Sequence, residues 1–514
     1  MNLLRAAATI SGLTLLSRVT GLMRDVVLAR MFGASAEMDA FNVAFRLPNL
    51  LRRVFAEGAF SQAFVPLFSA ARSRDGDVAA RVLLSDVASA LFWILLAVST
   101  LGVLGAPILV WVIASGFADQ PDKFALATQL TRWMFPYILM MSLVACLAAA
   151  LNTFKRFAVP AFTPVLLNLA FIGAALGLAP HLQTPILALA IAVLVGGALQ
   201  LSIQYAAVVR MGWLPRLVSP MAAFRSASVQ HVLRQMLPAL LGVSVAQISL
   251  IINTNIASYL PTGSVSWVSY ADRLMELPTA LLGVAIGTIL LPGMSTAFAS
   301  HDSARYQALI DWGLRLTLLI ALPATLGLAL LASDVISVLF EGQRFTAFDV
   351  KQTADALTGY CIGLVGLIAV KVLAPAYYAR RDLATPVKIA VIALIVTQLA
   401  NLVLVPHFAH AGLTAAISVG ALLNAGLLYL GLRRAGHLGV RPGWVGLLVK
   451  LVVALAALLA VVLAARGLWP VGIGAIWMWR AVWLAAVMTL AAAVYFGVLW
   501  ALGLRLRDFT LRLE

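Results

Sequence analysis

The sequence predicts an all-α polytopic membrane protein with about fourteen transmembrane helices, and three observations favour that class. First, 62% of the 514 residues are hydrophobic and only 11% are charged, whereas about a quarter of the residues in a soluble domain are charged. Second, apolar runs of about 20 residues recur along the chain, and each is long enough to cross roughly 30 Å of hydrocarbon as a helix. Third, the basic residues concentrate in alternate loops.

Hydropathy places the expected helices in order along the chain. Their approximate ranges are 8–32, 37–70, 80–114, 125–153, 159–179, 185–210, 232–260, 265–299, 305–340, 351–378, 385–406, 411–433, 444–465 and 478–503. The first apolar run continues past Arg18 without a small-residue cleavage site, so we expect a membrane helix there and not a removed signal peptide.

The charge balance follows the positive-inside pattern. The chain has 36 Lys and Arg against 20 Asp and Glu, a net charge of +16. Alternate loops hold most of the excess basic residues, as in the pairs Lys155–Arg156 and Arg380–Arg381. This distribution predicts that both termini are cytoplasmic, and it accounts for the positive charge without nucleic-acid binding. The two cysteines, Cys146 and Cys361, lie in apolar runs and are expected to be core residues without a disulfide.

An internal repeat of about 226 residues divides the chain. Pro66 matches Pro292, and Gly116 matches Gly342. Two further matches are Arg46 beside Arg273, and FKRFAVPAFTP (154–164) with YARRDLATP (378–386). Because six helices separate the copies, both have the same orientation in the membrane. We therefore expect two six-helix lobes, 1–215 and 225–435, related by a pseudo-twofold axis along the membrane normal, followed by two extra helices and a cytoplasmic tail in 440–514.

Charged residues inside the apolar spans are the candidate functional residues, because an Arg at a helix centre costs roughly 2.5 to 3.5 kcal/mol to insert. The first helix carries Arg18 and Asp25 nearly on one face, with Arg24 about 120° away. On the second helix, Asp39, Arg46, Arg53 and Glu57 form a stripe that Arg52 widens, and the second lobe supplies Asp272, Arg273 and Glu276. We expect a polar cavity; the alternative is that these arginines contact lipid phosphates at the membrane interface.

Arginine at these positions predicts an anionic ligand, since its planar guanidinium donates bidentately to phosphate oxygens and stays protonated. The candidate set contains almost as many acids as arginines, so the cavity is cationic only if acids pair locally. Helical spacing predicts two such pairs, Arg53 with Glu57 and Arg273 with Glu276.

Other chemistry is weakly represented. No His, Cys, Asp and Glu stand at metal-ligand spacing, and the sequence contains neither GxxxxGK[ST] nor GxSxG, so we expect no metal, no cofactor and no hydrolytic site. Energy then has to come from the membrane potential, a monovalent cation or a partner. Polar residues that could coordinate a cation or simply join helices are Asn253, Asn255, Asn401, Thr414 and Ser418. His407 and His410 are expected to be solvated near an outer loop.

Three segments carry a resemblance to a known family. They are RVTGLMRDVVLARMFGAS (18–35), DAFNVAFRLPNLLRRVFAEGAFSQAFVP (39–66) and SVSWVSYADRLMELP (264–278). Together with the fourteen-helix plan they resemble the MurJ (MviN) lipid II flippases, members of the superfamily that includes multidrug and toxin extruders and polysaccharide flippases.

The resemblance implies transport of lipid II, the undecaprenyl-diphosphate-linked peptidoglycan precursor, from the inner to the outer leaflet of the bacterial cytoplasmic membrane. It implies substrate-binding roles for Arg18, Arg24, Arg52 and Arg273, a place near the outward gate for Asp39, and inward-gate contacts for Arg53 and Glu57. It also implies that the last two helices form a groove for the lipid tail. A sodium site of some members needs acids, where this sequence offers asparagines.

Two other functions stay open from the residues alone. A drug or metabolite exporter of the same superfamily would line its cavity with acids and aromatic residues. A non-transporting scaffold for cell-wall synthesis proteins would have no reason to place arginines at membrane depth. Membrane lipids are expected partners in every case.

Overall fold

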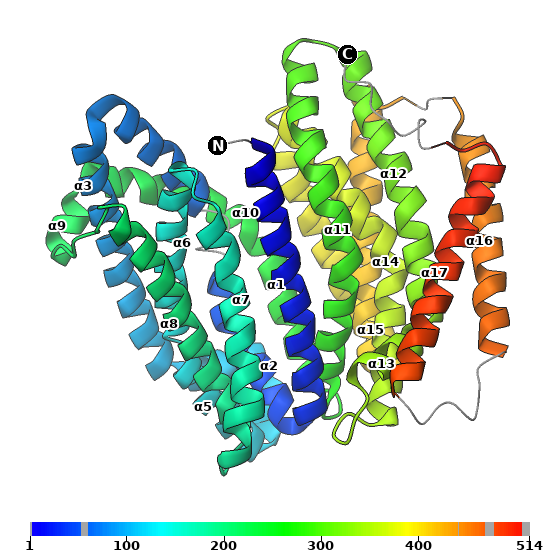
Figure 1. The fold of residues 1–514 in the computed structure, drawn as a ribbon, viewed down its shortest axis with the longest axis horizontal. Helices are drawn as coiled ribbons and strands as arrows, with labels where there is room; N and C mark the ends of the chain where they lie inside the picture. The colour runs from blue at the N-terminus through cyan, green and yellow to red at the C-terminus, as the bar shows by residue number, and fades with distance from the viewer. Residues whose placement is uncertain (1–2, 53–59, 440–441, 468–476, 506–514) are drawn as a thin grey trace. The chain divides into compact units, whose positions relative to one another are not determined.

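The structure is a computed structural model that describes residues 3–52, 60–439, 442–467 and 477–505, and every element it describes is a helix (Figure 1). The predicted all-α class is therefore confirmed. Nine helices in this part of the chain are long and apolar enough to span a membrane. The number fourteen stays a prediction.

Backbone contacts divide the chain into two units, each considered by itself. Unit 1 comprises 1–266 and 342–345, and unit 2 comprises 267–341 and 346–514. The predicted lobe boundary near 215–225 does not coincide with this division, because the helix that follows it packs on helices of unit 1.

Among the helices of unit 1, the second ends at Arg52 and not near residue 70, and the third begins at Phe60 and not near residue 80, so these two predicted limits are wrong; the other helices lie closer to the predicted ranges. The helices of unit 1 are α1 (Leu3–Phe32), α2 (Ala36–Arg52), α3 (Phe60–Leu104), α4 (Ala106–Ile113), α5 (Pro121–Met134), α6 (Tyr137–Thr153), α7 (Ala158–Gly173), α8 (Leu187–Arg210), α9 (Pro220–Arg225) and α10 (Ala227–Ser258), with short turns η2 (Ser115–Asp119), η3 (Ala174–Leu178) and η4 (Ala179–His181). Helix α3 leaves helical geometry at Gly76, where φ is 82°.

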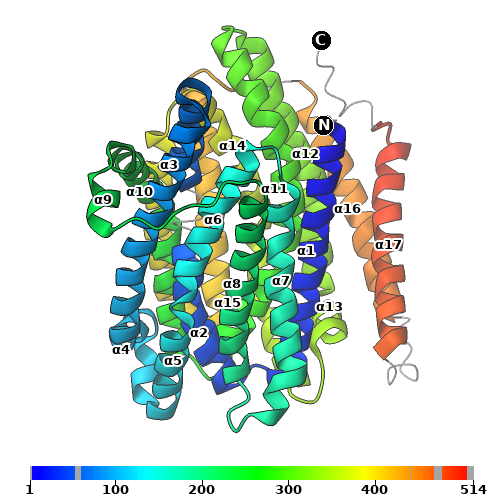
Figure 2. The same cartoon turned by 60° about the vertical axis from the view of Figure 1, so that its left-hand side comes forward.

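Within unit 1, α7 packs between α1 and α8, and α3 packs against α6 (Figures 1 and 2). Small residues permit the close approach: a Cβ added at Gly196 on α8 would lie 2.6 Å from Leu167 on α7. Aromatic rings join α2 to α7, where Phe41 and Phe45 each form a T-shaped pair with Phe171. Apolar helices without a hydrophobic driving force between them associate through such close packing.

Unit 2 contains α11 (Ser264–Ala299), whose first three residues belong to unit 1, and then α12 (Ser303–Leu330), α13 (Ala332–Phe340), α14 (Ala347–Ala379), α15 (Ala384–Arg434), α16 (Trp444–Gly467) and α17 (Trp477–Ala501). Helix α15 covers two of the predicted spans, and its backbone leaves helical geometry between them at Ala409, with φ 47° and ψ −127°.

Helices α14 and α15 pack through small residues. Gly359 and Gly363 of α14 lie against Thr414 and Ser418 of α15, and Ser418 Oγ donates to the Gly359 carbonyl at 2.7 Å. Of the two roles left open for Ser418, helix joining is the one its contacts support. Both cysteines are free and buried, as expected.

The last two helices form a hairpin, side by side in Figure 1, that is attached to α12 and α13. Trp444 Nε1 donates to Asp311 at 2.7 Å, and Arg466 pairs with Asp334 at 3.1 Å.

The prediction that His410 is solvated is wrong. Its side chain is buried, with Nε2 2.8 Å from the Gln352 carbonyl and its ring against Trp267.

Candidate functional site

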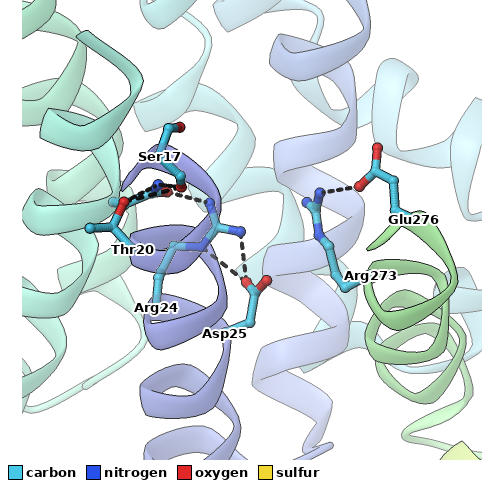
Figure 3. A network of polar contacts seen from close by, with 7 residues as sticks. Ser17, Thr20, Arg24, Asp25, Arg273 and Glu276 are labelled. Atoms are coloured by element: carbon cyan, nitrogen blue, oxygen red, sulfur yellow. Dashed lines mark hydrogen bonds and ion pairs between the residues drawn. The ribbon is translucent and has the colours of Figure 1, made fainter. Parts of the chain in front are cut away.

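Arg24 on α1 is the best-defined of the predicted substrate-binding residues. Its Nη2 and Nε lie 2.6 and 3.0 Å from Asp25 Oδ1, and both side chains are largely buried, at 14% and 13% exposure. Figure 3 shows the guanidinium turned back toward its chain neighbour. The helical separation of the two positions did not predict this pair, because adjacent residues do not face each other on a helix. The long arginine side chain bridges the gap.

Asn168 on α7 completes the surroundings of Arg24, and sequence reasoning missed it. Its Oδ1 accepts from Arg24 Nη1 at 3.1 Å, while its Nδ2 donates to the Ser17 carbonyl at 3.1 Å and to Thr20 Oγ1 at 3.2 Å. The side chain is 6% exposed. An asparagine in an otherwise apolar run was the available signal, since such residues usually pair across helices.

Arg24 also lies 5.5 Å from the centroid of the Phe171 ring. Asp25, Asn168 and this ring therefore fix the guanidinium from three directions. Arg18 lies on the same helix and is half-buried.

In unit 2, Arg273 and Glu276 on α11 form the ion pair that their spacing predicted, with Nη1 3.5 Å from Oε2 (Figure 3). The two side chains are 38% and 51% exposed, so solvent screens the pair and it contributes little stability. Asp272 beside them is half-buried. The predicted pairing of Arg273 with Glu276 is confirmed.

Three predicted residues are not placed. Arg52 ends α2, but its side chain is outside the described part of the structure, and Arg53 and Glu57 lie in the segment 53–59 that is not described. The predicted Arg53–Glu57 pair stays a prediction.

Asp39, at the start of α2, occupies a different environment from the arginines. It is 1% exposed and pairs with Lys123 Nζ at 3.0 Å. It also accepts from the backbone N–H groups of Gly263 at 2.8 Å and Ser266 at 2.9 Å, and from Ser266 Oγ at 2.7 Å. A buried carboxylate is tolerated only when paired and hydrogen-bonded in this way. No sequence pattern pointed to Lys123 as the partner of Asp39.

Arg46, the next charged residue of the predicted α2 stripe, reaches α10. Its Nη1 donates to Thr254 Oγ1 at 2.6 Å, and Thr254 in turn donates to the Leu250 carbonyl. Asn255 on the same helix donates to Ser115 Oγ at 2.8 Å and to the Val112 carbonyl at 3.1 Å. The described contacts of Asn255 therefore favour helix joining over ion coordination.

The repeat matches Gly116 with Gly342, and each of these glycines lies close to the end of another helix, α10 for Gly116 and α1 for Gly342. A Cβ at Gly116 would stand 2.6 Å from the Ser258 backbone, and one at Gly342 would stand 3.4 Å from Arg30 Cγ. The Gly116 N–H also donates to Ser258 Oγ at 3.0 Å. Glycine is needed at position 116 because the backbones come so close together.

Chemically, the part of the chain that the structure describes offers cation-mediated binding. No cluster of three or more His, Cys, Asp or Glu suited to a metal ion lies in it. Arg24 has five N–H donors, of which three are engaged by Asp25 and Asn168. The remaining two can donate to a ligand oxygen, which suits phosphate.

Comparison with known proteins places these features in context. A family model described as lipid II flippase MurJ matches residues 28–482. The lipid II flippase MurJ of Burkholderia cenocepacia is 50% identical over 519 residues, covering 100% of both chains. The probable lipid II flippase MurJ of Vibrio cholerae is 39% identical, covering 99% of this chain and 97% of the other.

Two solved structures share the fold. A lipid II flippase MurJ in an inward closed conformation matches with a TM-score of 0.78 at 24% identity, covering 95% of this chain and 98% of the other. An inward-facing multidrug resistance transporter of the MATE family matches with a TM-score of 0.69 at 13% identity, covering 84% and 98%.

Proposed function

The chain belongs to the lipid II flippase MurJ family, and on that premise we propose that it moves lipid II from the inner to the outer leaflet of the bacterial cytoplasmic membrane by alternating access. The observation that carries the proposal is Arg24, a guanidinium held in place inside an apolar helical unit with two N–H donors left over. A transporter of cationic drugs has no use for such a group.

The physical argument starts from solvation. Burying a diphosphate and its sugars in hydrocarbon is prohibitive, so the head group needs a hydrated, cationic path while the polyprenyl tail stays in lipid. We assign diphosphate binding to Arg18, Arg24, Arg52 and Arg273. Asp25 and Glu276 pair with two of these arginines and moderate the positive charge.

Alternating access would follow from the predicted duplication. Lobes 1–215 and 225–435 rock against each other, Asp39 and Lys123 close the outer end, and Arg53 and Glu57 make the contacts of the inward gate. Both termini then lie in the cytoplasm, and helices α16 and α17 guide the tail. Cell-wall synthesis proteins that consume the flipped precursor are the expected protein partners.

The membrane potential is the proposed energy source, and the protein has no hydrolytic role. An inside-negative potential of about 100 mV favours outward movement of an anionic head group by about 2.3 kcal/mol per charge that crosses the field. Coupling to a monovalent cation is the alternative. If collapse of the potential in intact cells leaves transport unchanged, the potential is not the source.

Depletion of the protein, followed by a leaflet-specific assay of lipid II, tests substrate and direction together. Precursor should accumulate on the inner leaflet. Arg24→Ala should fail to restore transport and Arg24→Lys should restore it partly, while the control Arg72→Ala, which breaks an exposed pair with Asp77, should restore it fully. Normal outer-leaflet lipid II during depletion would contradict the proposal.

A further inference from the structure

The linker between α8 and α10, residues 211–226, has the composition of a segment that lies on a lipid surface. It falls outside the candidate spans, yet its large apolar side chains are exposed, namely Leu214, Leu217, Met221 and Phe224 at 49%, 62%, 65% and 38%. It also carries Arg216 and Arg225, and the sequence contains no Asp or Glu between Asp122 and Asp272. Exposed apolar groups interleaved with unopposed basic ones are typical of segments that bind anionic membranes.

The linker is fixed to α3 by a short series of hydrogen bonds. The Arg216 N–H donates to Ser85 Oγ at 3.1 Å, and Ser89 Oγ donates to the Arg216 carbonyl at 3.2 Å. The Val218 N–H donates to Ser89 Oγ at 3.0 Å, and Trp93 Nε1 donates to the Val218 carbonyl at 3.0 Å. Both backbone groups of Arg216 are therefore held, so α3 fixes the point from which its side chain extends.

A cavity of about 370 Å³ lies beneath this part of the linker, between α3, α6 and α8. Its walls are largely apolar, as in Phe92, Leu147 and Leu201, and its polar lining includes Tyr205 and Arg216. The Arg216 side chain is exposed and makes no hydrogen bond or ion pair with the residues that the structure describes. An apolar cavity with one unpaired guanidinium in its lining suits a ligand that has an apolar chain and an anionic head.

We propose that this cavity and the linker bind an anionic phospholipid, with an acyl chain in the cavity and the head-group phosphate on Arg216. The guanidinium fork matches phosphate oxygens, and the cavity walls match the chain. Three further arginines, Arg210, Arg225 and Arg234, are exposed on the same stretch of chain. Their positive charge disfavours zwitterionic head groups, because these carry a cation of their own. The acids on α3 are Asp75, Asp77 and Asp86, of which Asp77 is paired with Arg72. This site is separate from the arginines assigned to lipid II.

Native mass spectrometry of the purified full-length protein can count bound phosphatidylglycerol against phosphatidylcholine. Phosphatidylglycerol should bind preferentially. Arg216→Gln should weaken it about fivefold, the factor that corresponds to roughly 1 kcal/mol for one basic residue at an anionic surface. The matched control Arg305→Gln removes an exposed arginine at the start of α12 and should leave the affinity unchanged.

A second variant tests the cavity without changing charge. Ala88→Trp places a large side chain in the cavity lining and should displace phosphatidylglycerol while Arg216 is intact. Inorganic phosphate at millimolar concentration should not compete, since it lacks the chain. The proposal is overturned by equal binding of the two lipids, by equal losses in Arg216→Gln and Arg305→Gln, by unchanged binding in Ala88→Trp, or by displacement with phosphate alone.

Discussion

Asn168 sets the position of Arg24, and its replacement by alanine is the sharpest test of the proposed site. The substitution removes the acceptor at 3.1 Å from Arg24 Nη1 and leaves the two contacts to Asp25 in place. Arg24 keeps its charge but loses the contact to α7 that fixes one end of the guanidinium. We therefore expect transport to fall while the membrane level of the protein stays close to normal.

The magnitude follows from the kind of bond that is lost. A hydrogen bond to a charged group contributes about 1.5 to 3 kcal/mol, and about 1.4 kcal/mol corresponds to a factor of ten in rate. Because Asp25 still restrains Arg24, the lower end applies, and lipid II transport by Asn168→Ala should be about tenfold slower. Arg24→Ala, which removes the cation altogether, should be slower still.

Thr20→Val is the matched control. Thr20 accepts from Asn168 Nδ2 at 3.2 Å, so its replacement perturbs the same α1–α7 contact without touching the bond to Arg24. The assay is leaflet-specific detection of lipid II in cells that depend on the variant, with protein levels measured in parallel. The reasoning is refuted if Asn168→Ala transports at the normal rate, or if both variants lose transport only in proportion to lost protein.

Three further predictions concern closure, packing and pH. Lys123→Met leaves the Asp39 carboxylate buried without its cation and should lower the stability of unit 1 by about 3 to 5 kcal/mol. In a thermal-unfolding assay, adding Asp39→Asn should recover much of the lost stability. Equal stability of the single and double variants would argue against the pair. Gly116→Ala should lower the melting temperature more than Gly342→Ala. The Cβ added at position 116 meets the backbone of Ser258, whereas the one added at position 342 meets the flexible side chain of Arg30. A larger loss for Gly342→Ala would contradict this description of the two contacts. The largest cause of the lowered pKa of Asp382 is the hydrogen bond that its carboxylate accepts from the N–H of Thr385. The charged carboxylate therefore stabilises the fold at neutral pH, and this contribution is lost as pH falls below about 4. The difference in stability between the protein and Asp382→Asn should narrow at that pH, and a difference that is independent of pH would exclude the effect.

The helices were predictable because their signal is local. An apolar run of sufficient length has few alternatives to a membrane helix, and so the ranges for α8, α11 and α16 agree with the hydropathy limits within a few residues. Breaks were less predictable: Phe135 and Pro136 separate α5 from α6 inside one apolar run. The grouping of helices into units depends on tertiary packing of α10, which no local pattern encodes.

The candidate site was predictable in its charges and not in its partners. Arginines inside apolar runs stand out in any sequence, as does an i, i+3 pair such as Arg273 with Glu276. Asn168 and Lys123 act on residues far away in the chain, at separations of 144 and 84 positions. Only the folded structure brings them together.

These partners answer the charge problem that the sequence raised. With nearly equal numbers of acids and arginines, the candidate set need not attract an anion. Asp39 contributes no free negative charge, because Lys123 and two backbone N–H groups neutralise it in a buried site. Asp25 is bound to Arg24, which keeps two N–H donors for a ligand. Removing Asp39 from the balance leaves the arginines in excess, and a diphosphate is the ligand that such an excess favours.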